Sequence, residues 1–256
     1  VLAGYDWSYG ISVNDGGTVV GFLNKSPGGF EHAFVWDPAG AGTMTALTHP
    51  AGYSSSLAAD INNAGTIVGY FFHDATQQVH AFRCMPPGPM EDLNVALGGG
   101  PGSMALGINN AGHIVGQRTR ADGKPVGFFY DGSIVRDFAE SYVTAGTLNG
   151  SLAYDLNDSD QVVGYYQFTP PAFPPPAPSP VMQTNAVAWN PGDATFTVFG
   201  SGFLMGINAS GQAAGNINLT GSGWHAAFWR GPGFTVDSVG SPATHNRALS
   251  VSDQGM

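Results

Sequence analysis

The sequence predicts an all-β fold, a β-propeller of five or six four-stranded antiparallel blades with a repeat of about 48 residues. Three observations predict it. A phrase centred on Asn recurs five times, a second phrase rich in aromatic residues follows each copy, and no segment of 11 or more residues has a clean helical period. Gly (38) and Pro (18) separate many short apolar runs, which is typical of proteins made of strands and turns.

The first phrase reads apolar residue, Asn, two turn residues, Gly, a polar residue, two small or β-branched residues, and Gly. Its Asn residues lie 47 to 51 residues apart, and a sixth copy starts 44 residues later with Ser252 in place of Asn. The five full copies contain Asn14, Asn62, Asn109, Asn157 and Asn208. Because Asn side chains bond to backbone two residues further on, each phrase predicts a tight turn between two strands.

The glycines of this phrase predict two special backbone positions. The position three residues after the Asn holds Gly17, Gly65, Gly112, Asp160 and Gly211. Gly takes a positive φ without a Cβ penalty, and Asp is among the next most tolerant residues, so this position predicts a left-handed turn residue. A second glycine, at 21, 69, 116, 164 and 215, falls inside a strand, where it predicts a close backbone approach or a β-bulge.

The second phrase predicts another strand in every unit. Its copies are His32–Trp36, His80–Cys84, Val126–Tyr130, Asn185–Trp189 and His225–Trp229. Large residues at alternate positions give the period of a strand. A further apolar run closes each unit, so the second unit is predicted to have strands at about 56–62, 66–72, 79–85 and 90–95.

The repeat runs from end to end, so we expect one domain over residues 1–256. Its units are predicted at about 7–55, 56–102, 103–149, 150–201 and 202–245, and residues 246–256 begin a further unit or form a closing strand. This makes 21 strands against the 20 of five closed blades. Either a sixth blade continues beyond Met256, or a surplus strand closes the ring or adds to an edge in another molecule. The Pro-rich insertion at 169–180 is predicted as a surface loop, with a contact arm as the alternative.

Composition excludes several classes of partner and site. The net charge is −10, and Lys25 and Lys124 are the only lysines, so no basic cluster exists to bind nucleic acid. The single cysteine, Cys84, excludes an intrachain disulfide and a cysteine-based zinc site. No apolar run approaches the roughly 20 residues that span a bilayer. The first residues carry no secretion leader, so we expect that a leader was removed or that the chain is a fragment.

The alternation of His-Ala-Phe, at His32–Phe34 and His80–Phe82, with Ile-Asn-x-x-Gly-x-Ile-Val-Gly resembles the HAF family of extracellular bacterial repeat proteins. The resemblance covers nearly the whole chain, although His is replaced at Val126 and Asn185, and Phe at Val187 and Ala227. It implies export from a bacterial cell and a repeat scaffold. It implies no catalytic residues.

A search for chemistry predicts no catalytic, cofactor-binding or metal-ligating residue. Residues 155–160 resemble the opening of a calcium loop, but the loop lacks its glycine at position six and has Tyr166 where the bidentate Glu belongs. The Gly-rich run at 98–102 is followed by a strand instead of the helix that phosphate binding requires. No Gly-x-Ser-x-Gly elbow is present, and Glu31, Glu91 and Glu140 share no repeat position, so no catalytic pair of carboxylates is predicted.

Recurring aromatic and His positions predict structural roles. His32, His80 and His225 share one repeat position, which favours hydrogen bonds between blades over a zinc site. A second repeat position holds large aromatic residues, which favours core packing over sugar stacking. These residues are Trp36, Tyr130, Trp189 and Trp229. Trp7 and Trp224 fall outside it and are better candidates for exposed contacts.

Together these features predict a non-enzymatic extracellular structural protein without a cofactor. We expect it to self-associate into filaments or a surface layer, or to join other extracellular matrix components. The alternative is a lectin-like propeller that binds glycans between blades. The third hypothesis is a glycan-acting enzyme with carboxylates from different blades.

Overall fold

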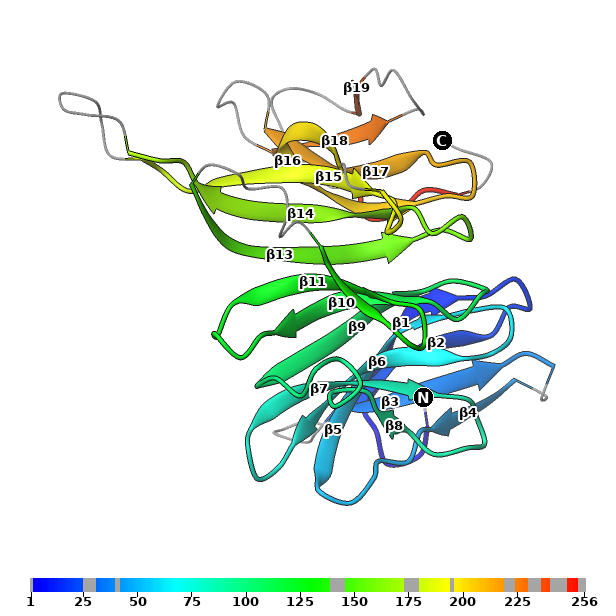
Figure 1. The fold of residues 1–256 in the computed structure, drawn as a ribbon. Coiled ribbons are helices and arrows are strands. Elements are labelled where there is room, and N and C mark those ends of the chain that lie inside the picture. The colour runs from blue at the N-terminus through cyan, green and yellow to red at the C-terminus, as the bar shows by residue number, and fades with distance from the viewer. Residues whose placement is uncertain are drawn as a thin grey trace. The chain divides into compact units, whose positions relative to one another are not determined.

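The computed structural model describes residues 2–24, 31–39, 42–138, 146–172, 180–193, 196–218, 224–229, 236–239 and 248–252, with the backbone alone over 236–239. Every regular element in these residues is a β-strand, and the registered strand pairs are antiparallel (Figure 1). The all-β, antiparallel class is therefore confirmed. The described residues contain no helix that could cross a membrane.

Three of the sheets have four strands, each in chain order. The first contains β1 (Trp7–Val13), β2 (Val19–Asn24), β3 (His32–Asp37) and β4 (Thr43–Ala46). The second contains β5 (Tyr53–Ile61), β6 (Ile67–His73), β7 (Gln78–Cys84) and β8 (Glu91–Asp92). The third contains β9 (Gly102–Ile108), β10 (Ile114–Thr119), β11 (Pro125–Tyr130) and β12 (Val135–Phe138). These sheets correspond to the first three predicted repeat units, one sheet to a unit.

The fourth sheet has seven strands and corrects the predicted count of five or six blades, because the described residues form four sheets. It contains β13 (Thr147–Leu156), β14 (Val162–Thr169), β15 (Gln183–Trp189), β16 (Phe196–Ile207), β17 (Ala213–Asn218), β18 (Trp224–Trp229) and β19 (Val236–Val239). The cause is β16, a strand of 12 residues. Its first half pairs with β15 up to Ser201 and its second half pairs with β17 from Gly202, so the fourth and fifth repeat units share one continuous strand (Figure 1).

The strands divide between two compact units, Val1–Gly123 with Tyr130–Val135, and Lys124–Phe129 with Arg136–Met256. In the first unit, apolar residues of the first sheet pack against residues of the second, among them Val20, Ala33, Leu47, Ala58, Ile61 and Phe82. In the second unit, a core forms from residues of β14 to β18, among them Val163, Ala186, Leu204, Ile207 and Trp229. In both units, a repeat buries its apolar residues against the next repeat.

The Asn phrase forms the predicted turn in all five copies. The residue three positions after the Asn has a positive φ in each: Gly17 (79°), Gly65 (83°), Gly112 (83°), Asp160 (60°) and Gly211 (74°). Asp160 is the copy without Gly, and it adopts the same left-handed conformation, as predicted. In the second copy the Gly65 N–H donates to the Asn62 carbonyl oxygen at 3.0 Å and the Thr66 N–H donates to Asn62 Oδ1 at 2.9 Å.

Each strand-interior glycine has both predicted features, a close backbone approach and a β-bulge in the facing strand. A Cβ on Gly69 would lie 2.0 Å from the Leu57 carbonyl oxygen, and the equivalent distance is 1.9 to 2.1 Å at Gly21, Gly116, Gly164 and Gly215. Each glycine faces a first strand whose register shifts by one residue, as between Ala58 and Asp60 in β5. The bulge brings the two backbones together and leaves no room for a side chain.

Two predicted segments are described only in part. The Pro-rich insertion lies between β14 and β15, but residues 173–179 fall outside the described residues, so its role as a loop or an arm stays a prediction. The sixth phrase is described as far as Ser252, and residues 253–256 lie outside the described residues. Ser250 and Ser252 lie beside β16: Ser252 accepts a hydrogen bond at its carbonyl oxygen from Asn208 Nδ2 at 2.9 Å.

Candidate functional site

The recurring Asn side chains join neighbouring repeats as well as closing their own turns. In the first unit, Asn14 Nδ2 donates to the Asn62 carbonyl oxygen at 3.1 Å, and Asn62 Nδ2 donates to the Asn109 carbonyl oxygen at 3.0 Å. In the second unit, Asn157 Nδ2 donates to the Asn208 carbonyl oxygen at 3.0 Å. The sequence reasoning assigned these residues to turns and missed this second role. We call the row of contacts the amide ladder.

A second row of contacts, also missed, uses a serine six residues before the Asn. The Ala33 N–H donates to Ser56 Oγ at 2.9 Å, and the Ala81 N–H donates to Ser103 Oγ at 3.0 Å. In the second unit the Gly127 N–H donates to Ser151 Oγ at 2.9 Å. Each pair joins the third strand of one repeat to the first strand of the next. The recurrence of Ser at this position was visible in the sequence and could have revealed the row.

Two aspartates, Asp60 and Asp155, lie at the β-bulges of their strands and form hydrogen bonds to a neighbouring repeat. Asp60 Oδ1 accepts from Ser12 Oγ at 2.6 Å in the preceding repeat, and its Oδ2 accepts from the Ile108 N–H at 2.8 Å in the following repeat. Burial raises the pKa of Asp60, against the lowering effect of these hydrogen bonds. Asp155, the first residue of the calcium-like segment, accepts the N–H of Ile207 at 2.9 Å through Oδ2. Its carboxylate therefore holds backbone, and no group of His, Cys, Asp or Glu among the described residues has a metal-binding arrangement.

The predicted role of His80 in joining blades is wrong. Its Nδ1 lies 2.9 Å from Asp92 Oδ2 and 3.3 Å from the Tyr53 hydroxyl, and all three residues belong to the second sheet. Asp92 pairs with Phe82, two residues beyond His80, so the two side chains are diagonal neighbours within the sheet. The Tyr53 hydroxyl also donates to Asp92. Although burial alone would raise it, the hydrogen bonds from Tyr53 and His80 hold the pKa of Asp92 below its usual range.

The same repeat position holds His32 and His225. His32 lies beside residues of its own repeat, and His225 is buried. The His32 ring lies 4.7 Å from the ring of His49 and 5.5 Å from that of Tyr5. His49 Nε2 is 2.6 Å from Ser56 Oγ, the serine that accepts from Ala33. Burial, reinforced by the neighbouring His32, lowers the pKa of His49 to about 4. His225 is buried, with 7% of its surface exposed.

The recurring Trp position packs in the core in the second unit. Trp189 stacks on Phe196 at 5.4 Å and contacts Phe138 at 5.8 Å, and Trp229 is fully buried beside Phe199. Trp36 is only half-buried. Outside this position Trp7 is 41% exposed, as predicted for an exposed contact.

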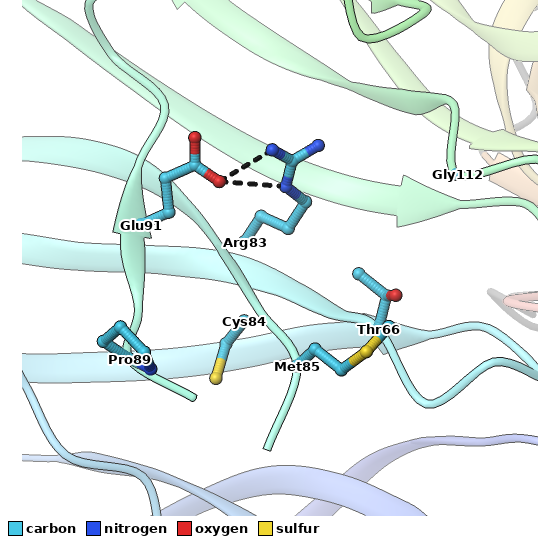
Figure 2. Close-up of a pocket in the computed structure, with 7 residues that line it drawn as sticks. All are labelled: Thr66, Arg83, Cys84, Met85, Pro89, Glu91 and Gly112. Atoms are coloured by element: carbon cyan, nitrogen blue, oxygen red, sulfur yellow. Dashed lines mark hydrogen bonds and ion pairs between the residues drawn. The ribbon is translucent and has the colours of Figure 1, made fainter. Parts of the chain in front are cut away.

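A pocket of about 310 Å³ lies at one end of the second sheet (Figure 2). It is lined by Thr66, Arg83, Cys84, Met85, Pro89, Glu91 and Gly112. Figure 2 shows Arg83 turned toward Glu91, and its Nη2 and Nε lie 2.7 and 3.1 Å from one carboxylate oxygen. Burial raises the pKa of the Cys84 thiol, which keeps it protonated. The pocket therefore offers one neutralised ion pair and an unreactive thiol.

The Gly-rich run at 98–102 packs against β10. Arg118 Nη1 donates to the Leu97 carbonyl oxygen at 2.9 Å, and a Cβ on Gly100 would lie 1.8 Å from the Thr119 carbonyl oxygen. Asn94 Nδ2 donates to the Gly100 carbonyl oxygen at 2.9 Å. These contacts explain the glycines of this run by close packing of the backbone, without a ligand. A second pocket, of about 260 Å³, lies beside this run and includes Arg118.

The most distinctive surface is one face of the first repeat, which we call the leading face. It is formed by Ser8, Gly10, Val13, Asn14 and Val19. Val13 is 61% exposed, whereas the equivalent Ile61, Ile108, Leu156 and Ile207 are 5 to 9% exposed. In the second repeat, Ile61 lies in one core cluster with Val20 and Ala33 of the first repeat. The leading face thus has the residue positions that the second repeat uses to pack against the first.

Residues 3–81 match the model of a family described as protein of unknown function (DUF3466). No curated protein matches the sequence significantly. Among solved structures, the crystal structure of TolB from Acinetobacter baumannii is similar, with a TM-score of 0.56 and 10% identity over 91% of this chain and 54% of that chain. The chain thus spans about half the length of TolB. TolB is a β-propeller, and this likeness, at so low an identity, shows the fold alone: the chain has a β-propeller-like all-β fold.

Proposed function

We propose that this chain is a non-enzymatic extracellular scaffold that associates with other copies of itself. The observation that carries the proposal is the set of hydrogen bonds by which recurring Asn, Ser and Asp side chains join one repeat to the next. Side chains that serve to join neighbouring repeats are expected in a repeat scaffold.

The contacts between repeats support a scaffold role for the recurring polar residues. Three of these side chains bond to the backbone of a neighbouring repeat. Asn62 donates to a carbonyl oxygen, and Ser103 and Asp60 each accept an N–H. These side chains are used in holding the repeats together, so they are not available for chemistry on a substrate. The HAF resemblance of the sequence supports an extracellular location.

Negative-stain electron microscopy and sedimentation velocity of the purified chain test the proposal. We expect oligomers or filaments whose share rises with protein concentration. Compact monomers at every concentration, with no assembly on addition of salt to screen the charge of −10, would overturn the assembly role.

A second function, glycan binding, is favoured by the exposed aromatic residues of β1. Tyr9 is 61% exposed and stacks on Phe22 at 5.8 Å, and Trp7 is 41% exposed. Such rings suit the apolar face of a sugar. A glycan array with wild type and a Trp7→Ala, Tyr9→Ala variant tests it. Hits that the variant loses support glycan binding, and an array without hits excludes the sugars it carries.

A further inference from the structure

The pocket at the end of the second sheet lies where the second repeat departs from the pattern of the other repeats. The fourth position of the His-Ala-Phe phrase is Arg83 in the second repeat. The other four repeats have an apolar residue there, and two of these, Phe129 and Phe228, are only 2% exposed. The remaining two are Val35 and Ala188. The repeat therefore accepts, and in two copies buries, an apolar side chain where the pocket has a guanidinium group.

The stability of the sheet does not explain this exchange. Arg83 pairs across the sheet with Glu91 of β8, and the two side chains are 35% and 56% exposed. An ion pair this exposed stabilises a fold less than the burial of an apolar side chain does. A pair of opposite charges at this position is therefore better explained by a ligand than by packing.

The ion pair leaves polar groups free on both of its partners. Arg83 Nε and Nη2 both donate to a single oxygen, Glu91 Oε2, at 3.1 and 2.7 Å. Arg83 Nη1 and Glu91 Oε1 form no hydrogen bond within the described residues, and Figure 2 shows the third guanidinium nitrogen turned away from Glu91. The hydroxyl of Thr66 likewise has no hydrogen bond in the described part of the chain, because only its backbone is used, by Asn62. The pocket thus has a free donor, a free acceptor and a hydroxyl that can act as either.

The rest of the lining is apolar or bare backbone. Met85, which is 54% exposed, and Pro89 come from the connection between β7 and β8, and Gly112 comes from the Asn turn of the third repeat. Prolines at 86, 87 and 89 restrict φ in this connection, which limits the motion of the wall that it forms. Sites for small molecules range from about 300 to 1,000 Å³, so a pocket of about 310 Å³ suits a ligand with one ring.

We propose that this pocket binds a neutral sugar residue. A sugar hydroxyl donates and accepts at once, so two adjacent hydroxyls can bond to Arg83 Nη1 and Glu91 Oε1 while the ion pair stays intact. The C–H face of the sugar ring packs on Met85. The ion pair has no net charge, and the net charge of −10 on the chain disfavours an anionic ligand. A cationic ligand would be repelled by Arg83.

The inference does not rest on self-association. It belongs to the same class as the second function, glycan binding, but it assigns that function to residues other than Trp7 and Tyr9 of β1. All the residues that line the pocket lie within the first compact unit.

NMR titration of the full chain tests the site with glucose, galactose, mannose and N-acetylglucosamine, each as the free monosaccharide and as a short oligomer. We expect at least one of them to bind. Arg83→Val introduces the residue of the first repeat and should raise the dissociation constant at least about 10-fold. Thr66→Val removes one hydroxyl and should raise it about 2- to 10-fold. Arg120→Val is the matched control, because Arg120 forms a similar ion pair with Asp122 outside the pocket and its loss changes the net charge equally. It should bind like the wild type.

The Trp7→Ala, Tyr9→Ala variant separates the two glycan sites, and it should bind the sugar as the wild type does. Loss of binding in that variant, with binding kept in Arg83→Val, would overturn the pocket site and leave glycan binding in place. Equal losses in Arg83→Val and Arg120→Val, or no binding of any sugar in the set, would also overturn it. Self-association is measured separately by sedimentation velocity, so it stands or fails independently. Binding of an oligomer alone, lost in Arg83→Val, would support the site and identify a sugar chain as its ligand.

Discussion

The side-chain amide nitrogen of Asn62 lies 3.0 Å from the backbone carbonyl oxygen of Asn109, which is 47 residues further along the chain. The oxygen of the same amide accepts the Thr66 N–H at 2.9 Å. One buried side chain, 5% exposed, thus closes its own turn and holds the next repeat. Only a side chain with a donor and an acceptor at this reach can do both, which explains why Asn recurs.

Replacing Asn62 with Asp tests the amide ladder. Asp keeps the oxygen that accepts the Thr66 N–H, but it lacks the amide donor. It also places a buried negative charge against the Asn109 carbonyl oxygen. We expect the free energy of unfolding to fall by about 3 kcal/mol. Urea denaturation measures it. Asn110→Asp is the control, because the exposed Asn110 accepts the Asn63 N–H with an oxygen that Asp retains. Equal losses in the two variants would contradict the ladder.

Replacing Gly69 with Ala tests the close approach at the bulge. The new methyl group would lie 2.0 Å from the Leu57 carbonyl oxygen, so the two strands must separate. We expect a loss of about 3 kcal/mol or more, or a chain that fails to fold. Gly192→Ala is the matched control, since a Cβ there has no atom within 4 Å. A thermal melt of Gly69→Ala that matches the control would exclude the close contact.

Among the five described copies of the Asn phrase, Asp160 is the one residue with a side chain at the left-handed turn position, at φ 60°. Substitution with Gly, the residue of the other copies, should raise the free energy of unfolding by up to about 1 kcal/mol. Substitution with Val, a β-branched residue, should lower it by about 1 to 2 kcal/mol. Chemical denaturation of both variants measures the order Gly, Asp, Val. The reverse order would show that the turn does not control stability here.

The lowered pKa of His49 predicts how the stability of the folded chain depends on pH. Burial, together with the neighbouring His32, lowers its pKa to about 4 in the folded chain, whereas an unfolded His titrates near 6.5. Between these values the unfolded chain binds more protons, so stability contributed by His49 is present above pH 6.5 and is lost as the pH falls toward 4.

Urea midpoints measured across this pH window should fall with decreasing pH in the wild type. His49→Gln, which keeps a donor near Ser56, should have a shallower fall. His73→Gln is the control, since its ring bonds within the local turn at Thr76. An unchanged pH slope in His49→Gln would rule out His49 as the titrating group.

The turns and bulges could be predicted because their causes are local. The left-handed position of Asp160 follows from its place in a phrase where four copies have Gly, and the bulge opposite Gly69 follows from a glycine inside a strand. The strand positions of the second repeat follow from alternation, and β5, β6 and β7 match the predicted ranges closely. The last strand is shorter than predicted, because the chain turns after Asp92 and Asn94 bonds to Gly100.

Apart from the recurring Ser, contacts between repeats could not be predicted from the same reasoning, because they depend on which strands become neighbours. The bridge from Asp60 to Ile108 spans 48 residues. The shared strand β16 depends on whether a chain bends or continues between Ser201 and Gly202, and nothing in those residues alone decides it. For His80, the pattern identified a structural role but not the partner, since Asp92 is reached only once the sheet has formed.

The amide ladder ends on a backbone carbonyl, and every residue type carries one. Ser252 accepts from Asn208 as Asn109 accepts from Asn62, although the side chains differ. A repeat therefore places no demand on the side chain of its successor at this contact. Whole repeats of 44 to 51 residues can be duplicated, lost or exchanged by recombination, and the new junction forms its hydrogen bond without any matching substitution.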